Sequence, residues 1–237
     1  MKRRMLVAAA TLAALCVHVC AGAATPRYVA MSLVGDEITY TGAPETSTGT
    51  LRPRGKSQGV PMKGAPFDRT VLEVLAGAVP RAQPGATLSF LAVSAPEAFV
   101  NQEAWFDGDK VTLPASVRGA VDKEGASQLL LVTKFRGEAG VTDGETKFGF
   151  GKLSGLGFYI DGNTDMIDPK IGPVHGFIAP YVYVKLSVVD LATSTVTARR
   201  VVQSATPFTS LNAQAMMDAL QDTLVKSMTE AVERTLK

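Results

Sequence analysis

The sequence predicts an α/β (α+β) domain of two or three layers, in which a mixed sheet carries helices packed on its faces. Three observations lead to this fold class. Helix-like and strand-like segments alternate up to residue 132, closely spaced strand-like segments fill 146–205, and an apolar stripe at helical spacing runs through 211–237. The second observation indicates an antiparallel, hairpin-rich second half of the sheet. The third predicts a long C-terminal amphipathic helix that covers one face.

The first 23 residues have the pattern of a cleaved signal peptide. Lys2, Arg3 and Arg4 precede an uncharged, mostly apolar run over 5–19, and small residues follow at 21–23. This order of segments predicts export and cleavage after residue 23. The apolar run is too short for a comfortable transmembrane helix, which needs about 20 residues. No later stretch matches it, so we expect no transmembrane helix in the mature chain.

Lipid attachment at Cys20 is the other interpretation of this segment. Bacterial lipidation requires a small residue directly before the cysteine and usually a leucine three residues before it. Val19 and Val17 occupy these positions. The sequence therefore disfavours lipidation.

Removal of the signal peptide changes the composition of the chain. The Lys and Arg count falls from 24 to 21 against 22 Asp and Glu, so the net charge changes from +2 to −1. Both cysteines and His18 also leave, and His175 becomes the only histidine. The mature chain therefore has no disulfide, thiolate nucleophile or zinc–cysteine site. Its near-neutral charge argues against nucleic-acid binding. We expect residues 24–237 to form a single domain.

Residues 27–41 are rich in β-formers with apolar side chains on one face, which predicts a strand or a bent pair of strands. A long loop without periodicity follows at 42–66 and has a basic character. Its cations are Arg52, Arg54, Lys56 and Lys63. The loop is interpreted either as a mobile, solvated segment or as a basic flap for an anionic partner.

Three helices are predicted in the first half of the domain. Asp68 is placed to cap a helix that Pro80 ends. A short buried strand is expected at 87–93. A second helix is predicted over 96–105, and a third opens at Pro114 and stops before Gly125.

The remaining strands have clearer patterns. The apolar run at 129–132 predicts a strand that is buried on both faces. Alternating aromatic and aliphatic residues predict a strand over 146–160, in which the glycines indicate a twist or bulge and not a phosphate-binding loop. Segments 177–189 and 195–205 predict an antiparallel hairpin.

The terminal helix at 211–237 is predicted to be capped by Ser210 or Asn212. Met216 and Val225 flank its apolar stripe, and we interpret these flanks as candidate contact sites for a partner protein.

Three segments together resemble a group of bacterial envelope proteins. They are a helix ending at Gly125-Ala126 with the apolar strand after it, a long strand closing on Val189-Asp-Leu-Ala-Thr193, and the terminal helix. This order is similar to the amino-terminal domain of TolB, the periplasmic domain of CsgG and LpoB, and it covers about half of the mature chain. The resemblance implies a non-catalytic envelope module that docks on other proteins. It carries over no functional residues, and Ser194 stands where the group has a glycine.

His175 is the candidate catalytic residue, because a Ser–His–Asp triad would have to use the only imidazole. The sequence has no Gly-x-Ser-x-Gly motif, and Ser154 in 151–155 lies one position away from it. The alternative is an ordinary hydrogen-bonded histidine in a Gly/Pro turn.

A calcium site is the candidate metal site. Asp161, Asn163 and Asp165 offer oxygen ligands at the first, third and fifth positions of a calcium loop, and Asp168 follows shortly after. The loop pattern fails at its sixth and twelfth positions, which are Met166 and Gly172. A turn between strands uses the same residue types, and the sequence favours that interpretation.

These observations favour an exported, periplasmic, non-catalytic protein that serves cell-envelope assembly or maintenance by binding other envelope proteins, without a cofactor. Secretion beyond the cell stays open. The alternatives are a secreted hydrolase that uses His175 or the acids near Asp161, and a calcium- or small-ligand-binding envelope protein.

Overall fold

A computed structural model describes residues 25–43, 56–93, 95–143, 145–168, 172–208 and 212–237, and it confirms the predicted fold class. The helices are α1 (Pro66–Ala82), η1 (Pro96–Phe99), η2 (Gln102–Trp105), α2 (Ala115–Lys123) and α3 (Ala213–Leu236). The strands are β1 (Arg27–Leu33), β2 (Glu37–Gly42), β3 (Ser57–Pro61), β4 (Thr87–Leu91), β5 (Phe106–Asp107), β6 (Lys110–Val111), β7 (Gln128–Lys134), β8 (Arg136–Glu138), β9 (Val141–Asp143), β10 (Thr146–Phe148), β11 (Lys152–Asp168), β12 (Gly172–Asp190) and β13 (Thr195–Ala205).

The sheet is organised around β12, the longest strand. In the described part of the chain, eleven strands join in this sheet, and β9 and β10 form a separate pair. One edge of β12 pairs with β11 through its first half and with β7 from Val184 onward, and β13 pairs antiparallel with the other edge. β7, β1 and β4 are parallel neighbours in that order, with β4 last. The predicted hairpin of β12 and β13 is therefore confirmed, and it joins a parallel part of the sheet to an antiparallel part.

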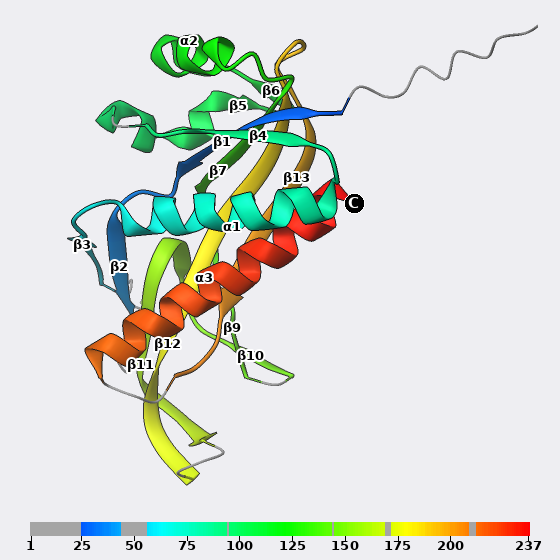
Figure 1. The fold of residues 1–237 in the computed structure, drawn as a ribbon. Helices are drawn as coiled ribbons and strands as arrows, with labels where there is room; N and C mark the ends of the chain where they lie inside the picture. The colour runs from blue at the N-terminus through cyan, green and yellow to red at the C-terminus, as the bar shows by residue number, and fades with distance from the viewer. Residues whose placement is uncertain (1–24, 44–55, 94, 144, 169–171, 209–211) are drawn as a thin grey trace, which may run out of the picture.

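Helices cover both faces of the sheet. α1 and α3 lie beside each other on one face (Figure 1), where they bury the largest apolar cluster. A second cluster on the opposite face of the parallel part lies beneath η1, η2 and α2. The strand predicted at 129–132 lies between them and is buried on both faces. A third cluster holds the buried tyrosines Tyr159, Tyr181 and Tyr183 beside β8 and β9.

α3 confirms the prediction made for the terminal segment. The Asn212 side chain caps it by accepting a hydrogen bond from the Ala215 N–H at 3.1 Å. Leu220, Leu224 and Met228 are fully buried against the sheet and α1. Among the described residues, no helix combines the length and the apolar character that crossing a bilayer requires.

Residues 27–42 form the predicted pair of strands, and Asp68 holds the bend between them. Its carboxylate accepts hydrogen bonds from the Ser32 hydroxyl at 2.6 Å and from the Val34 and Gly35 amides at 2.9 and 3.2 Å. Gly35 has a φ of +81°, which a side chain would strain. The prediction that Asp68 caps α1 was therefore wrong, because its oxygens face the bend and α1 begins at Pro66 without a side-chain cap.

Four other local predictions need correction. The strand expected to be buried at 87–93 is β4, in which no residue is fully buried. Pro80 lies inside α1 and does not end it; the hydrogen bond that it removes would have gone to the carbonyl of Ala76, an exposed residue. Part of the predicted loop at 42–66 is strand β3, which pairs antiparallel with β2. The segment 96–105 forms two short 3₁₀-helices because Asn101, with φ of +56°, interrupts it.

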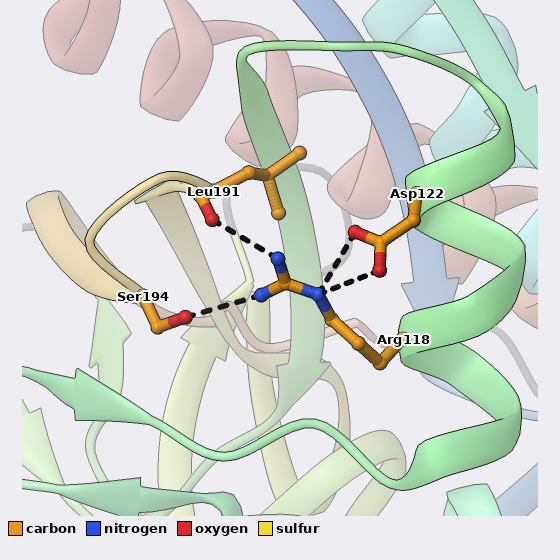
Figure 2. A network of polar contacts seen from close by, with 4 residues as sticks. All are labelled: Arg118, Asp122, Leu191 and Ser194. Atoms are coloured by element: carbon orange, nitrogen blue, oxygen red, sulfur yellow. Dashed lines mark hydrogen bonds and ion pairs between the residues drawn. The ribbon is translucent and has the colours of Figure 1, made fainter.

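The apex of the β12–β13 hairpin is fixed to α2 by one arginine. Arg118 donates to the Leu191 carbonyl at 3.2 Å and to the Ser194 hydroxyl at 3.1 Å, while its Nε contacts Asp122 at 2.8 Å (Figure 2). Ser194 has φ of +53°. Glycine adopts this left-handed conformation most readily, and Arg118 contacts the serine that stands there.

Candidate functional site

A groove lies between α1 and the end of β4, and we call it the α1–β4 groove. Its volume is about 390 Å³. It lies at the carboxyl ends of the parallel strands β1 and β4, where open α/β sheets commonly bind their ligands. Its lining consists of Ser32, Gly64, Ala65, Asp68, Arg69, Leu72, Glu73, Ala76, Phe90, Leu91, Ala92 and Val93.

The walls of this groove are apolar because α1 and β4 each direct part of their apolar face toward it. α1 buries Val71, Leu75 and Val79 in the main core, and the adjoining stripe through Leu72 and Ala76 faces the groove. On β4, Leu88 packs against the main core. Phe90 belongs to the same face of the strand, two residues further on, and is 45% exposed. An exposed aromatic ring at the mouth of an apolar groove is a typical feature of a binding surface.

The outer edge of β4 is unprotected. β4 pairs with β1, and no strand of the described chain pairs with its other edge. Its sequence, Thr-Leu-Ser-Phe-Leu, contains neither charge nor proline. Exposed edges of this kind pair readily with another chain, and proteins usually guard them with lysine, proline or a bulge.

The other long edges of the sheet carry such guards. β3 ends at Pro61 and stands between Lys56 and Lys63. β13 pairs with β6 only at Thr195, and beyond that point it carries Arg199 and Arg200. β4 is therefore the described long edge that is both apolar and unguarded.

The polar residues of the groove have different roles. Asp68 is occupied by the β1–β2 bend, and burial raises its pKa, partly offset by its hydrogen bonds from Ser32, Gly35 and Val34. Arg69 and Glu73 are exposed on the rim, one helical turn apart, and neither forms an ion pair within the described residues. The groove thus provides apolar contacts, the unpaired edge of β4 and two rim charges.

The predicted catalytic and metal residues lie elsewhere, on the β11–β12 hairpin. His175 Nδ1 is 2.7 Å from Asp165 Oδ1, and the side chains are 69% and 88% exposed. An imidazole–carboxylate pair is one part of a triad, but at this exposure water screens it. The pair sits on strands that extend beyond the helices (Figure 1).

Asp161 is buried, and its oxygens already have partners. Oδ1 accepts from the Asn163 and Thr164 amides at 2.8 and 3.1 Å, and Oδ2 accepts from the Thr164 hydroxyl at 2.9 Å. The expected turn between strands is wrong, because these residues lie inside β11 at an irregularity between Asp161 and Asp165. Asp168 follows in the same strand. Within the described ranges, no three His, Cys, Asp or Glu residues are grouped to hold a metal ion.

The predicted partner-binding residues are dispersed. Arg52 and Arg54 lie outside the described residues, while Lys56 and Lys63 are exposed on either side of β3. On α3, Met216 packs partly buried against the main core and Val225 is 39% exposed. A groove of about 520 Å³ between α3 and β13 is lined mainly by polar and charged residues, among them Arg200, Asp222 and Glu230.

The comparisons with known proteins are remote. No family model and no curated protein matches the sequence. Several solved structures are similar to the chain, among them the following three. Protein XCC0632 from Xanthomonas campestris, assigned to the family DUF330, is 12% identical with a TM-score of 0.44, over 89% of this chain and 83% of that one.

A putative neuraminyllactose-binding hemagglutinin homolog from Helicobacter pylori is 9% identical with a TM-score of 0.42, over 88% and 82%. A PelC dodecamer from Paraburkholderia phytofirmans is 9% identical with a TM-score of 0.29, over 87% and 89%. At these values no functional argument rests on the likenesses.

Proposed function

We propose that this protein is a non-catalytic, exported protein of the cell envelope that acts by binding another protein chain along the α1–β4 groove. The observation that carries the proposal is the unguarded edge of β4 beside an apolar wall. A bound extended chain would pair with the free amides and carbonyls of β4, while its side chains would enter the groove.

The sequence supports the location and the absence of catalysis. The basic start, apolar run and small residues at 21–23 are typical of a cleaved signal peptide. The resemblance of three segments to envelope modules that dock on proteins agrees with a binding role. Within the groove the Ser32 hydroxyl donates to Asp68, and the same carboxylate accepts from the Val34 amide, so both groups hold the β1–β2 bend.

Site-specific photo-crosslinking in cells tests the proposal. A photoreactive residue replaces Phe90, and parallel variants carry it at Val225 and at Lys123, which is exposed on α2 across the sheet. We expect a discrete adduct with an envelope protein from position 90 and none from position 123. The adduct should disappear when Leu88→Pro removes an amide from the outer edge of β4 while the circular dichroism spectrum is retained. An adduct from position 225 alone would transfer the role to α3.

Mass spectrometry of the exported protein tests the location. We expect an amino terminus at Ala24 and recovery in the periplasmic fraction. A retained amino-terminal segment in the cytoplasm would contradict the envelope assignment.

A further inference from the structure

We propose that a small oxyanion, a carboxylate or phosphate group, binds between Lys185 of β12 and Arg199 of β13, beside the Phe106 ring. This place lies on the face of the sheet beneath η2 and β5, whereas the α1–β4 groove lies on the other face. The inference therefore goes beyond the proposed function and does not depend on it. It follows from a cluster of hydrogen-bond donors and positive charges that have too few acceptors among the described residues.

The cluster consists of polar side chains at neighbouring positions on three adjacent strands. Lys185 and Ser187 lie two residues apart on β12 and therefore point to the same face. Thr133 of β7 is paired with Lys185, and Arg199 of β13 is paired with Ser187. Side chains paired in this way have Cβ atoms about 5 Å apart. The face is that of the second apolar cluster, because Leu131, which pairs with Ser187 from β7, belongs to it.

Two hydroxyls of this cluster are buried without a partner. Ser187 is 0% exposed and Thr133 is 1% exposed, and neither side-chain oxygen forms a hydrogen bond within the described part of the chain. A buried hydroxyl without a partner is costly, and native proteins seldom keep one unless a bound water or ion satisfies it. Both hydroxyls stand beside Lys185, one across from it on β7 and one next to it on β12.

The positive charge beside these hydroxyls is not balanced. Lys185 is partly buried, and its Nζ lies 4.0 Å from the centre of the Phe106 ring, while Arg199 Cζ lies 5.6 Å from the same ring. Across the described ranges, the ammonium of Lys185 forms no ion pair. Burial lowers the pKa of Lys185, and Arg199 lowers it by more than Glu103 raises it. The potential at Lys185 is therefore positive, although Arg199 also contacts the exposed Asp109 at 3.7 Å.

An oxyanion supplies what this cluster lacks. An ammonium and a guanidinium only donate hydrogen bonds, and a hydroxyl can donate, so the cluster needs acceptors and negative charge together. A water molecule would satisfy the hydroxyls but would leave the two cations unbalanced. A carboxylate or phosphate has several acceptor oxygens, which suits donors that come from different strands. Arg199 is exposed and marks the side that is open to solvent, so the oxyanion can be a free ion or the end group of a larger molecule.

Thermal melting and isothermal titration with sodium phosphate test the inference, with sodium chloride at the same ionic strength as the reference. We expect phosphate, and not chloride, to raise the melting temperature to a plateau, because a ligand of the folded state stabilises it. Lys185→Met and Ser187→Ala should each weaken phosphate binding by about tenfold, since each removes a donor to a charged group. Without phosphate neither variant should melt below the wild type, because each loses an unsatisfied group. Lys226→Met, at an exposed position on α3, is the control and should bind phosphate as the wild type does.

Two results would overturn the inference. One is a melting temperature that phosphate and acetate raise no more than chloride does, which would show that water alone satisfies the hydroxyls. The other is phosphate binding that survives both Lys185→Met and Ser187→Ala, which would place the ion elsewhere. Stabilisation by acetate as well as phosphate would assign the site to carboxylates in general, and stabilisation by phosphate alone would assign it to phosphate groups. Crosslinking from position 90 is measured separately, so either proposal can fail while the other stands.

Discussion

Replacement of Asp68 should destabilise the bend between β1 and β2, which its carboxylate holds by hydrogen bonds. Asp68→Ala leaves the Ser32 hydroxyl and the Val34 and Gly35 amides without their acceptor. Each lost bond to a charged acceptor is worth about 1.5–3 kcal/mol. The removed carboxylate no longer has to be desolvated, and water can enter from the adjacent groove. We therefore expect a net loss of about 3 kcal/mol, which lowers the melting temperature of a domain of this size by about 6–12 °C.

The pH dependence gives a second, independent measure of this carboxyl. Burial is the largest influence on Asp68 and raises its pKa above 3.8, so the folded state binds the proton more tightly than the unfolded chain. Its contribution to stability is then fully present below the unfolded pKa and declines as the pH rises through the folded pKa. Asp68→Asn, which keeps one acceptor oxygen, should cost more stability near pH 3.5 than near pH 7.

Urea unfolding followed by circular dichroism, at several pH values, measures both effects. Glu73→Gln, a change on the exposed rim of the same helix, is the control and should alter stability by less than about 0.5 kcal/mol. A loss below about 1 kcal/mol for Asp68→Ala would show that the carboxylate does not hold the bend. A cost of Asp68→Asn that grows with pH would refute the argument from burial.

Three further changes test other parts of the fold. Asn212→Ala removes the cap of α3 and should cost about 1 kcal/mol in urea unfolding, because the Ala215 amide loses its acceptor. Tyr183→Phe should cost about 1–2 kcal/mol at pH 7. Burial raises the pKa of Tyr183 above 10.0, so its contribution is lost as the pH rises from the unfolded towards the folded pKa, and the variant should lose less stability than wild type above pH 10. The hydrogen bonds from the Thr193 amide and hydroxyl lower the pKa of Asp190 below 3.8. Its contribution is present above the unfolded pKa and lost as the pH falls through the folded pKa, so Asp190→Asn should flatten the stability profile below pH 4.

The elements that the sequence predicted well carry long, regular patterns. β12, β13 and α3 repeat their apolar residues over 11 to 24 positions, and these patterns determined both type and pairing. The errors fall where a single contact overrides a local signal. Asp68 lies where a helix-capping residue is expected, but its oxygens accept hydrogen bonds from the bend between β1 and β2. The five residues of β3 are exposed and include a glycine and a proline, so its sequence does not predict a strand. The segment is a strand because it pairs with β2.

Sequence patterns could not predict the candidate site, for a different reason. The α1–β4 groove joins residues 64–76 to residues 90–93, and nothing in either segment indicates the angle at which they meet. The residues chosen from the sequence were the ones with chemical character, namely His175, Asp161 and the basic loop. The groove is built instead from alanine, leucine and phenylalanine, which the same patterns assign to the core. Its only signal is an apolar strand of five residues that lacks a guarding charge.

That missing guard is the strongest reason to regard the face as a contact surface. The edges at β3 and β13 carry lysine, arginine or proline, so this fold protects its edges where they meet solvent. An unprotected β4 would expose the protein to aggregation unless another chain covers it. The exposed Phe90, with the groove beside it, points to the same covering chain. A charge placed on this edge should therefore leave the domain folded but abolish the capture of its partner chain, whereas the same change on β13 should alter neither property.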